Sequence, residues 1–171
     1  MRAILAEQVH DARQPLRVRL LVDRAGDSRV EVFPLEPIRE PLRVALAAGP
    51  IDPADPFFFH KTTRRGMLEA QRREGYDDTV LWNPDRDITE TIIANIVVER
   101  GGQKVTPPVE CGLLPGTMRA ELIARGEIVE ERITVDQLLR AGRFRLINSV
   151  RGWMQAELVE VELPTDPFDI S

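Results

Sequence analysis

Two nearly contiguous stretches, DTVLWNPDRDITE (78–90) and ANIVVERGGQKVTPP (94–108), decide the fold. Both alternate between apolar and polar residues, which is the pattern of half-buried β-strands. Asn83-Pro84-Asp85 and Gly101-Gly102 interrupt the alternation with residues that favour tight turns. We therefore expect strand, turn, strand, turn and strand over this part of the chain.

Helix-like segments lie on both sides of these strands. TTRRGMLEAQRREG (62–75) predicts a helix with Thr62 or Thr63 as its N-cap and Gly75 as its end. LLPGTMRAELIARG (113–126) predicts a loop that enters a helix at Pro115-Gly116. Further on we expect a strand, a short helix and two strands at 127–133, 135–142, 143–150 and 156–163. The pattern as a whole is that of an α+β protein.

The N-terminal third has a different pattern. Residues 2–12 are compatible with a short amphipathic helix, and 15–37 predict a hairpin around Ala25-Gly26-Asp27. A third strand is expected at 41–49, and three prolines then follow between Pro50 and Pro56. We therefore divide the chain into a first lobe, a linker, a second lobe and a tail, at 1–50, 51–56, 57–164 and 165–171.

Composition sets limits on the class of protein. The chain has 171 residues, 43% of them hydrophobic, and a formal net charge of −5. Its apolar runs are shorter than the roughly 18 residues of a membrane span, and the one cysteine has no disulfide partner within the chain. The basic cluster at 61–73 is typical of a solvated helix face. We therefore predict a cytoplasmic protein that binds neither membrane nor nucleic acid.

Lys61 is the first candidate for chemistry. Three phenylalanines, Phe57 to Phe59, precede it and predict that the chain leaves the core near residue 61. An exposed lysine near a helix start is the ordinary interpretation. A lysine in a partly desolvated pocket, however, has a lowered pKa and can form a Schiff base with an aldehyde.

Glu90 is the second candidate, because alternation along its strand predicts the same face for Ile88, Glu90 and Ile92. An edge carboxylate facing water is the simpler interpretation. A carboxyl group on an apolar face instead needs a charged partner or a bound proton. Beside a ring nitrogen it would keep that nitrogen protonated.

Two further segments carry hydrogen-bond donors. The helix expected after Pro115-Gly116 exposes the backbone N–H groups of Thr117 and Met118, which suits a phosphate, although most helix starts bind only water. INSVRGW (147–153) gathers donors at a strand end, where a turn satisfied by its own side chains is the default. The two histidines, His10 and His60, lack partners at ligand spacing, so no metal site is expected.

Taken together, four motifs in this order resemble the fold type IV pyridoxal-phosphate enzymes, the family of class IV aminotransferases and aminodeoxychorismate lyases. The motifs are FHKTTRR (59–65), ETIIANIVV (90–98), TPPVECGLLPGTMR (106–119) and NSVRGW (148–153), and the similarity extends over 41–163. It implies an α+β fold like that of D-amino-acid aminotransferase, with a truncated first lobe and a β-rich C-terminal lobe that binds the cofactor.

The resemblance also implies roles for single residues. Lys61 would bond covalently to pyridoxal 5′-phosphate, and Glu90 would face the pyridine nitrogen. The remaining implied contacts are Asn95 at the cofactor site, Gly116, Thr117, Met118, Ser149 and Val150 at the phosphate, and Arg151 at a substrate carboxylate. Family members carry an earlier segment with a phosphate-clamping arginine, which this sequence lacks, so Arg64 or Arg65 would supply that charge.

The motifs FHKTTRR and NSVRGW are more similar to the lyase branch of the family. They imply conversion of 4-amino-4-deoxychorismate to 4-aminobenzoate and pyruvate in folate biosynthesis, by a homodimer that takes a small amino substrate. One alternative is a class IV aminotransferase of branched-chain or D-amino acids. The other is an inactive family member that serves as a binding module, since the phosphate-clamping segment is absent.

Overall fold

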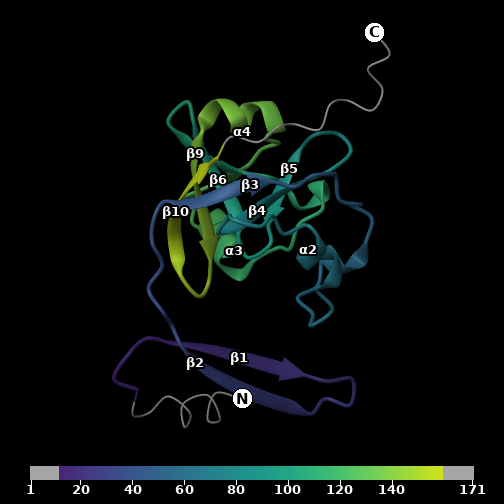
Figure 1. Ribbon diagram of the computed structural model, residues 1–171, viewed down its shortest axis with the longest axis vertical. Coiled ribbons are helices and arrows are strands. Elements are labelled where there is room, and N and C mark those ends of the chain that lie inside the picture. The colour runs from purple at the N-terminus through teal and green to yellow at the C-terminus, as the bar shows by residue number, and fades with distance from the viewer. Residues whose placement is uncertain (1–11, 160–171) are drawn as a thin grey trace. The chain divides into compact units, whose positions relative to one another are not determined.

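The structure is a computed structural model, and it describes residues 12–159 (Figure 1). The chain divides into two compact units, Met1–Arg39 and Glu40–Ser171. The helix expected at 2–12 and the tail at 165–171 lie almost wholly outside the described residues. All the candidate residues for chemistry belong to the second, larger unit.

The smaller unit contains the expected hairpin. β1 (Leu16–Val22) pairs antiparallel with β2 (Ser28–Pro34), with Leu16 opposite Pro34 and Val22 opposite Ser28. The connecting turn is closed by Asp23, whose side-chain oxygen accepts the N–H groups of Ala25 and Asp27, both at 2.9 Å. Gly26 has a φ of 91°, which a side chain would disfavour. The turn residues therefore have the chemistry that the sequence predicted.

The larger unit is built on an eight-stranded mixed sheet, in the order β5-β4-β3-β10-β9-β6-β7-β8. β5 also pairs with β6, so six of these strands close into a ring. β3 runs parallel to both β4 and β10, and β7 runs parallel to β8. The strands are β3 (Leu42–Leu46), β4 (Asp78–Trp82), β5 (Ile88–Thr91), β6 (Asn95–Arg100), β7 (Gln103–Thr106), β8 (Val129–Glu130), β9 (Arg143–Asn148) and β10 (Gly152–Leu158).

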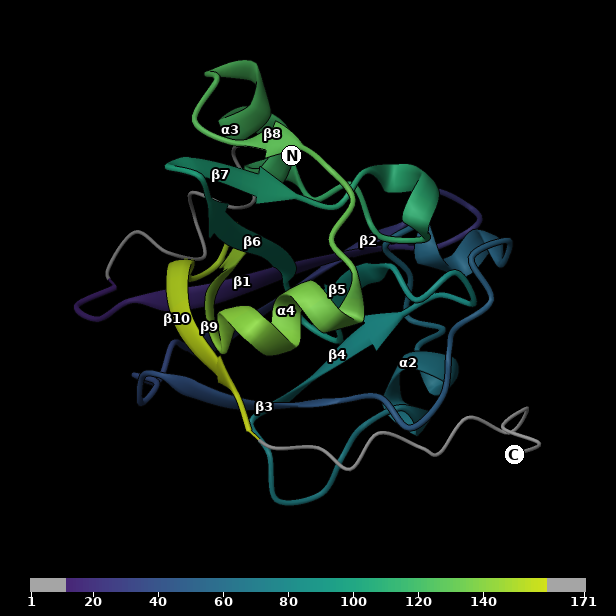
Figure 2. The ribbon, with the colours of Figure 1, turned by 90° about the horizontal axis from the view of Figure 1, so that it is seen from above.

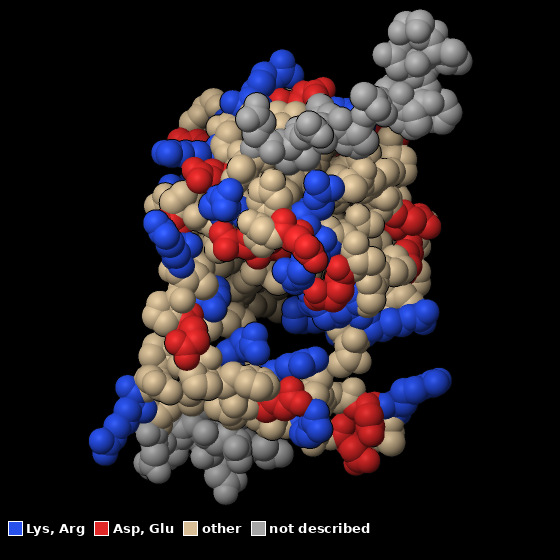
Figure 3. Space-filling model, viewed as in Figure 1, with Lys and Arg blue, Asp and Glu red and all other residues tan. Residues whose placement is uncertain are grey.

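Short helices lie in the connections between these strands. They are η1 (Pro56–Phe58), α2 (Gly66–Ala70), η2 (Val109–Cys111), α3 (Thr117–Ala124) and α4 (Val135–Ala141). α3 and α4 both contact β9, and Figures 1 and 2 show them at separate places along the sheet. No helix within residues 12–159 has the length and apolar character that a membrane crossing requires. On the face seen in Figure 3, basic and acidic side chains are interspersed.

The helix expected at 62–75 is shorter than predicted. α2 begins at Gly66 and spans five residues, and its N-cap is Arg65. Thr62 does not cap it, because its hydroxyl oxygen accepts the N–H of Arg64 at 3.1 Å in a local turn. After the helix, the N–H of Arg73 donates to the Thr79 hydroxyl at 3.0 Å, which draws the chain onto β4. These tertiary contacts override the helical pattern.

The predicted linker at 51–56 does not coincide with the division between the units. β3, which the sequence assigned to the first lobe, is a member of the larger sheet between β10 and β4. Ile51 is buried, and its N–H donates to the Trp82 carbonyl at 2.8 Å. The prolines at 50, 53 and 56 therefore shape a packed connection inside the larger unit.

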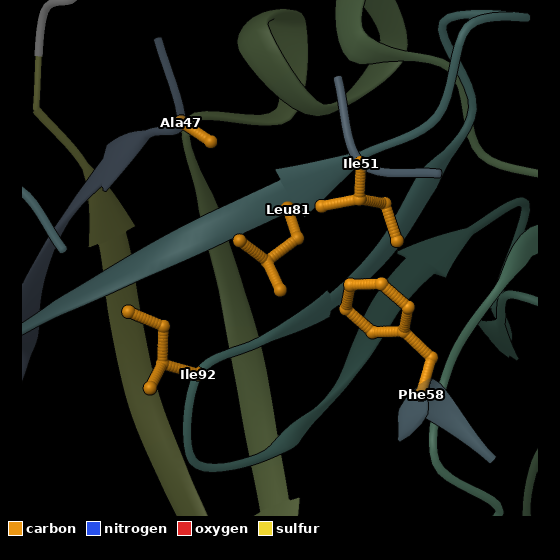
Figure 4. Packing of buried hydrophobic residues seen from close by; sticks show 5 residues of the cluster. All are labelled: Ala47, Ile51, Phe58, Leu81 and Ile92. Atoms are coloured by element: carbon orange, nitrogen blue, oxygen red, sulfur yellow. The ribbon is translucent and has the colours of Figure 1, made fainter. Parts of the chain in front are cut away.

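A hydrophobic cluster fixes the segment that leads to Lys61. Ala47, Ile51, Phe58, Leu81 and Ile92 pack together, and Figure 4 shows the Phe58 ring reaching toward Ile51 and Leu81. Phe58 is only 3% exposed, whereas Phe57 and Phe59 are half-buried. Burying one phenylalanine stabilises the fold by roughly 1.5–3 kcal/mol. Phe58 therefore anchors the chain three residues before Lys61.

Candidate active site

A cavity of about 190 Å³ opens between the segment after Phe58, the turn between β5 and β6, the start of α3 and the end of β9. Most of the residues that the sequence singled out line it. Those residues are Lys61, Glu90, Asn95, Gly116, Thr117, Met118 and Ser149. Val150 and Arg151 are not among the described residues that line this cavity.

Glu90 lies in the wall of the cavity and is only 6% exposed. Ile88 and Ile92 are buried as well, as the alternation along β5 predicted. The carboxyl group accepts the N–H of Leu114 at 3.1 Å. Burial raises the pKa of the Glu90 carboxyl to about 8, although that N–H and the charge of Lys61 lower it. Burial therefore favours the protonated form of Glu90.

Asn95 connects Glu90 to the loop that enters α3. Glu90 and Asn95 are directly opposite each other in the β5–β6 pair, so their side chains share one face. The Asn95 amide nitrogen donates to Glu90 Oε2 at 3.3 Å and to the Leu114 carbonyl at 2.9 Å. A Cβ added at Gly116 would lie 2.3 Å from Asn95 Oδ1. Asn95 thus fills the space in which a side chain at residue 116 would lie.

The start of α3 faces the cavity with its hydrogen-bond donors. Gly116 is the N-cap, and no side chain caps the helix. The first N–H groups of a helix lack partners within the helix and carry a partial positive charge. The hydroxyl groups of Thr117 and Ser149 are 2.8 Å apart, so they link α3 to the end of β9. Amide and hydroxyl donors therefore converge at one end of the cavity.

Lys61 lies at the cavity but is exposed, as are all residues from His60 to Arg64. The sequence had suggested an amine at the edge of the core. The structure buries Phe58 instead and leaves the following segment at the surface. The charge of Lys61 still lowers the pKa of Glu90, so the two side chains interact across the same cavity.

Two arginines that follow Lys61 also line the cavity, and they differ in their partners. The Arg65 guanidinium donates to the Ile92 carbonyl at 2.7 Å and lies 3.5 Å from Glu69 Oε1. The Arg64 guanidinium lies over the Phe57 ring, 4.5 Å from its centroid. The sequence pointed to these arginines only as substitutes for a missing phosphate contact. It did not predict the place of His60 or Asn148 in the cavity wall.

Val150 and Arg151 belong to the turn between β9 and β10. The Asn148 side-chain oxygen accepts the N–H groups of Val150 at 3.0 Å and of Arg151 at 2.9 Å. Val150 is 46% exposed. The turn is therefore satisfied by one of its own side chains, which was the simpler of the two interpretations. Ser149 alone of these three turn residues lines the cavity.

Comparisons with known proteins define the class of protein, a fold type IV enzyme of the family that uses pyridoxal phosphate. The sequence matches the profile of the family described as amino-transferase class IV over residues 1–159. A Schizosaccharomyces pombe protein described as a candidate aminodeoxychorismate lyase is 32% identical over 166 residues. The match covers 91% of this chain and 71% of that protein. The chain belongs to the class IV aminotransferase family.

Solved structures show the same fold. A candidate amino-acid aminotransferase from Mesorhizobium loti has a TM-score of 0.83 and 32% identity, over 92% of this chain and 80% of that one. A candidate 4-amino-4-deoxychorismate lyase from Legionella pneumophila has a TM-score of 0.69 and 26% identity, over 87% of this chain and 60% of that one. The α+β fold expected from the four motifs is confirmed.

Proposed function

We propose that the protein is a pyridoxal-phosphate-dependent lyase that converts 4-amino-4-deoxychorismate to 4-aminobenzoate and pyruvate. The observation that carries the proposal is that Lys61, Glu90 and the start of α3 line one cavity. The Schizosaccharomyces pombe and Legionella pneumophila relatives are both described as candidate lyases of this kind, which favours the lyase within the family. In this proposal the enzyme acts in folate biosynthesis.

The residues present fit pyridoxal 5′-phosphate. Lys61 offers an amine to the aldehyde, and the buried Glu90 carboxyl suits the pyridine nitrogen. At the other end of the cavity, the N–H groups at the start of α3 and the paired hydroxyls of Thr117 and Ser149 suit a phosphate. Gly116 and Met118 complete this phosphate cradle, and a Cβ at residue 116 has no room. Asn95 positions Glu90 and the cradle relative to each other.

When bound, the cofactor supplies a ring that withdraws electrons from the substrate carbon next to the amine. Lys61 Nζ, once it is neutral, takes the proton from C4 of the substrate while the C3–O bond breaks. The ring that is left becomes aromatic and is 4-aminobenzoate. The released enolpyruvate gains a proton at its methylene carbon, which Lys61 can return, and becomes pyruvate. The Glu90 carboxyl group would donate a hydrogen bond to the pyridine nitrogen during these steps.

The lyase proposal is tested by product formation. Purified protein is loaded with pyridoxal 5′-phosphate and mixed with 4-amino-4-deoxychorismate, and 4-aminobenzoate is measured by its fluorescence after chromatography. We expect 4-aminobenzoate and pyruvate in equal amounts without any added keto acid. The absence of both products from a protein that has bound the cofactor would refute the lyase.

Amino transfer is the second candidate, because the Mesorhizobium loti structure with the TM-score of 0.83 is described as a candidate amino-acid aminotransferase. This reaction needs a keto acid for its second half. Transfer from a branched-chain or D-amino acid that depends on added keto acid would favour it over the lyase. A protein that shows no visible absorption band with added cofactor would instead be an inactive binding module. The homodimer and the cytoplasmic location stay predictions.

A further inference from the structure

Arg64 is a cation at the cavity whose charge the site does not use. Within residues 12–159 no carboxylate forms an ion pair with it, whereas the neighbouring Arg65 is engaged by Glu69 and by the Ile92 carbonyl. Arg64 and Lys61 line the same cavity. The donors that suit a phosphate lie on other elements, at α3 and the end of β9.

The fold holds Arg64 in place from two sides. Its N–H donates to the Thr62 hydroxyl at 3.1 Å, which fixes the backbone in a turn. Its guanidinium lies over the Phe57 ring, and the Phe57 N–H is in turn held by the Asp55 carboxylate at 2.8 Å. A guanidinium stacked on an aromatic face is already oriented, and its edge N–H groups stay free for a planar anion.

Arg64 is exposed, and it lies at the edge of a second, mostly apolar hollow. Arg64 also lines an adjoining hollow of about 300 Å³, whose other walls are Phe57, Phe58, Gly66, Met67 and Leu68. These walls are mostly apolar, so they can contact the apolar part of a ligand whose anionic group meets Arg64. A carboxylate matches the fork of a guanidinium with two parallel hydrogen bonds.

We propose that Arg64 binds a carboxylate of the substrate whose amine meets Lys61, and so selects amino compounds that carry a carboxylate. This inference rests on the proposed function for the position of the amine. It assigns to Arg64 the role that the sequence gave to Arg151, which does not line the cavity among the described residues.

The test measures binding rather than turnover. The binding of 4-aminobenzoate to the cofactor-loaded protein is measured by calorimetry for the wild type, Arg64→Gln and Arg64→Lys. Charge-assisted hydrogen bonds of this kind change affinity by about tenfold or more, so Arg64→Gln should bind at least tenfold more weakly. Arg64→Lys should recover part of the loss, because it keeps the charge without the fork.

Two controls isolate the carboxylate. Arg143→Gln removes an arginine whose side chain is 83% exposed on β9, outside this cavity, and should leave binding unchanged. 4-Aminobenzamide lacks the carboxylate, so the wild type should bind it weakly and Arg64→Gln should weaken it no further. Such a cycle shows that the residue and the carboxylate act on each other.

Each of three results would overturn the inference. The first is equal affinity of the wild type and Arg64→Gln for 4-aminobenzoate. The second is a loss of pyridoxal 5′-phosphate binding in Arg64→Gln, seen in the visible spectrum, which would assign Arg64 to the cofactor phosphate. If the wild type binds no 4-aminobenzoate, the lyase proposal fails independently of Arg64. The affinities of the wild type and the same variants are then measured for 4-methyl-2-oxopentanoate, a keto acid with a carboxylate. Failure to bind either carboxylate also overturns the role of Arg64.

Discussion

At Glu90, the place of a residue in the sheet determines the protonation chemistry of its side chain. Its strand, β5, closes the ring of six strands by pairing with β6. The carboxyl group therefore lies among buried side chains rather than at a solvent-exposed edge of the sheet. Burial raises the pKa of Glu90 to about 8, from an ordinary value of 4.5. A carboxyl group that keeps its proton at pH 7 can serve a ring nitrogen without leaving an unpaired charge in the protein.

The raised pKa of Glu90 predicts how stability depends on pH. Between pH 4.5 and pH 8 the unfolded chain loses this proton while the folded protein keeps it. The free energy of unfolding should therefore fall as pH rises through this range. We expect the melting temperature of the cofactor-free wild type to fall by a few degrees more than that of Glu90→Gln between pH 6 and pH 8.

Thermal unfolding followed by circular dichroism gives this comparison, with Glu99→Gln as the control on an exposed strand position. The control should follow the wild type across the pH range. Identical pH dependence in the wild type and in Glu90→Gln would show that Glu90 is ionised in the folded protein.

Among the elements, the loop from Leu114 to Gly116 is held by Asn95, whose amide nitrogen donates to the Leu114 carbonyl at 2.9 Å. Gly116 has a φ of −61° and a ψ of 143°, which any residue adopts, so backbone strain does not explain the glycine. A close contact explains the glycine instead, because a Cβ at residue 116 would lie 2.3 Å from Asn95 Oδ1. The glycine allows Asn95 to hold Glu90 and the start of α3 together.

Gly116→Ala should therefore weaken cofactor binding at least tenfold, because Asn95 must move and the cradle at α3 moves with it. Titration with pyridoxal 5′-phosphate, followed in the visible spectrum, measures the change. Gly49→Ala is the matched control, since a Cβ there meets nothing within 4 Å. Unchanged affinity in Gly116→Ala would mean that the cradle does not depend on this contact.

The short η1 helix links the core to the cavity through Phe58. Phe58→Ala should lower the free energy of unfolding by about 3–5 kcal/mol, because it empties a site packed against Ile51, Leu81 and Ile92. Denaturant unfolding measures the loss, and Phe57→Ala, at a half-buried position, should cost less. A loss below about 1 kcal/mol would contradict the anchoring role of Phe58.

At the scale of the whole molecule, sequence reasoning worked where the signals were local. Alternation between apolar and polar residues predicted three strands over 78–108, where the structure has four, β4 to β7, because the chain turns again at 92–94 between β5 and β6. Pro115-Gly116 marked the start of α3. The resemblance carried by the four motifs also implied that Lys61, Glu90 and Thr117 meet, and these three residues line one cavity. The predicted strands and the start of α3 each depended on a pattern within about ten residues.

Features that depend on distant partners could not be predicted in this way. β3 joins the larger sheet because it pairs in parallel with β4 and β10, and nothing within its five residues specifies those partners. The place of Arg64 depends on the Phe57 ring, and the turn at Val150 depends on Asn148. In these cases tertiary packing, rather than local propensity, decides the outcome.

The central claim is that Lys61 is the amine that bonds to the cofactor, and this sequence offers an internal control because it contains only two lysines, Lys61 and Lys104. Lys104 lies over the Trp153 ring and lines a different hollow. The most direct measurement is peptide mass spectrometry after the protein is mixed with pyridoxal 5′-phosphate and reduced with borohydride. We predict the pyridoxyl group on Lys61 and only trace labelling of Lys104. Equal labelling of both lysines, or none on Lys61, would contradict the account.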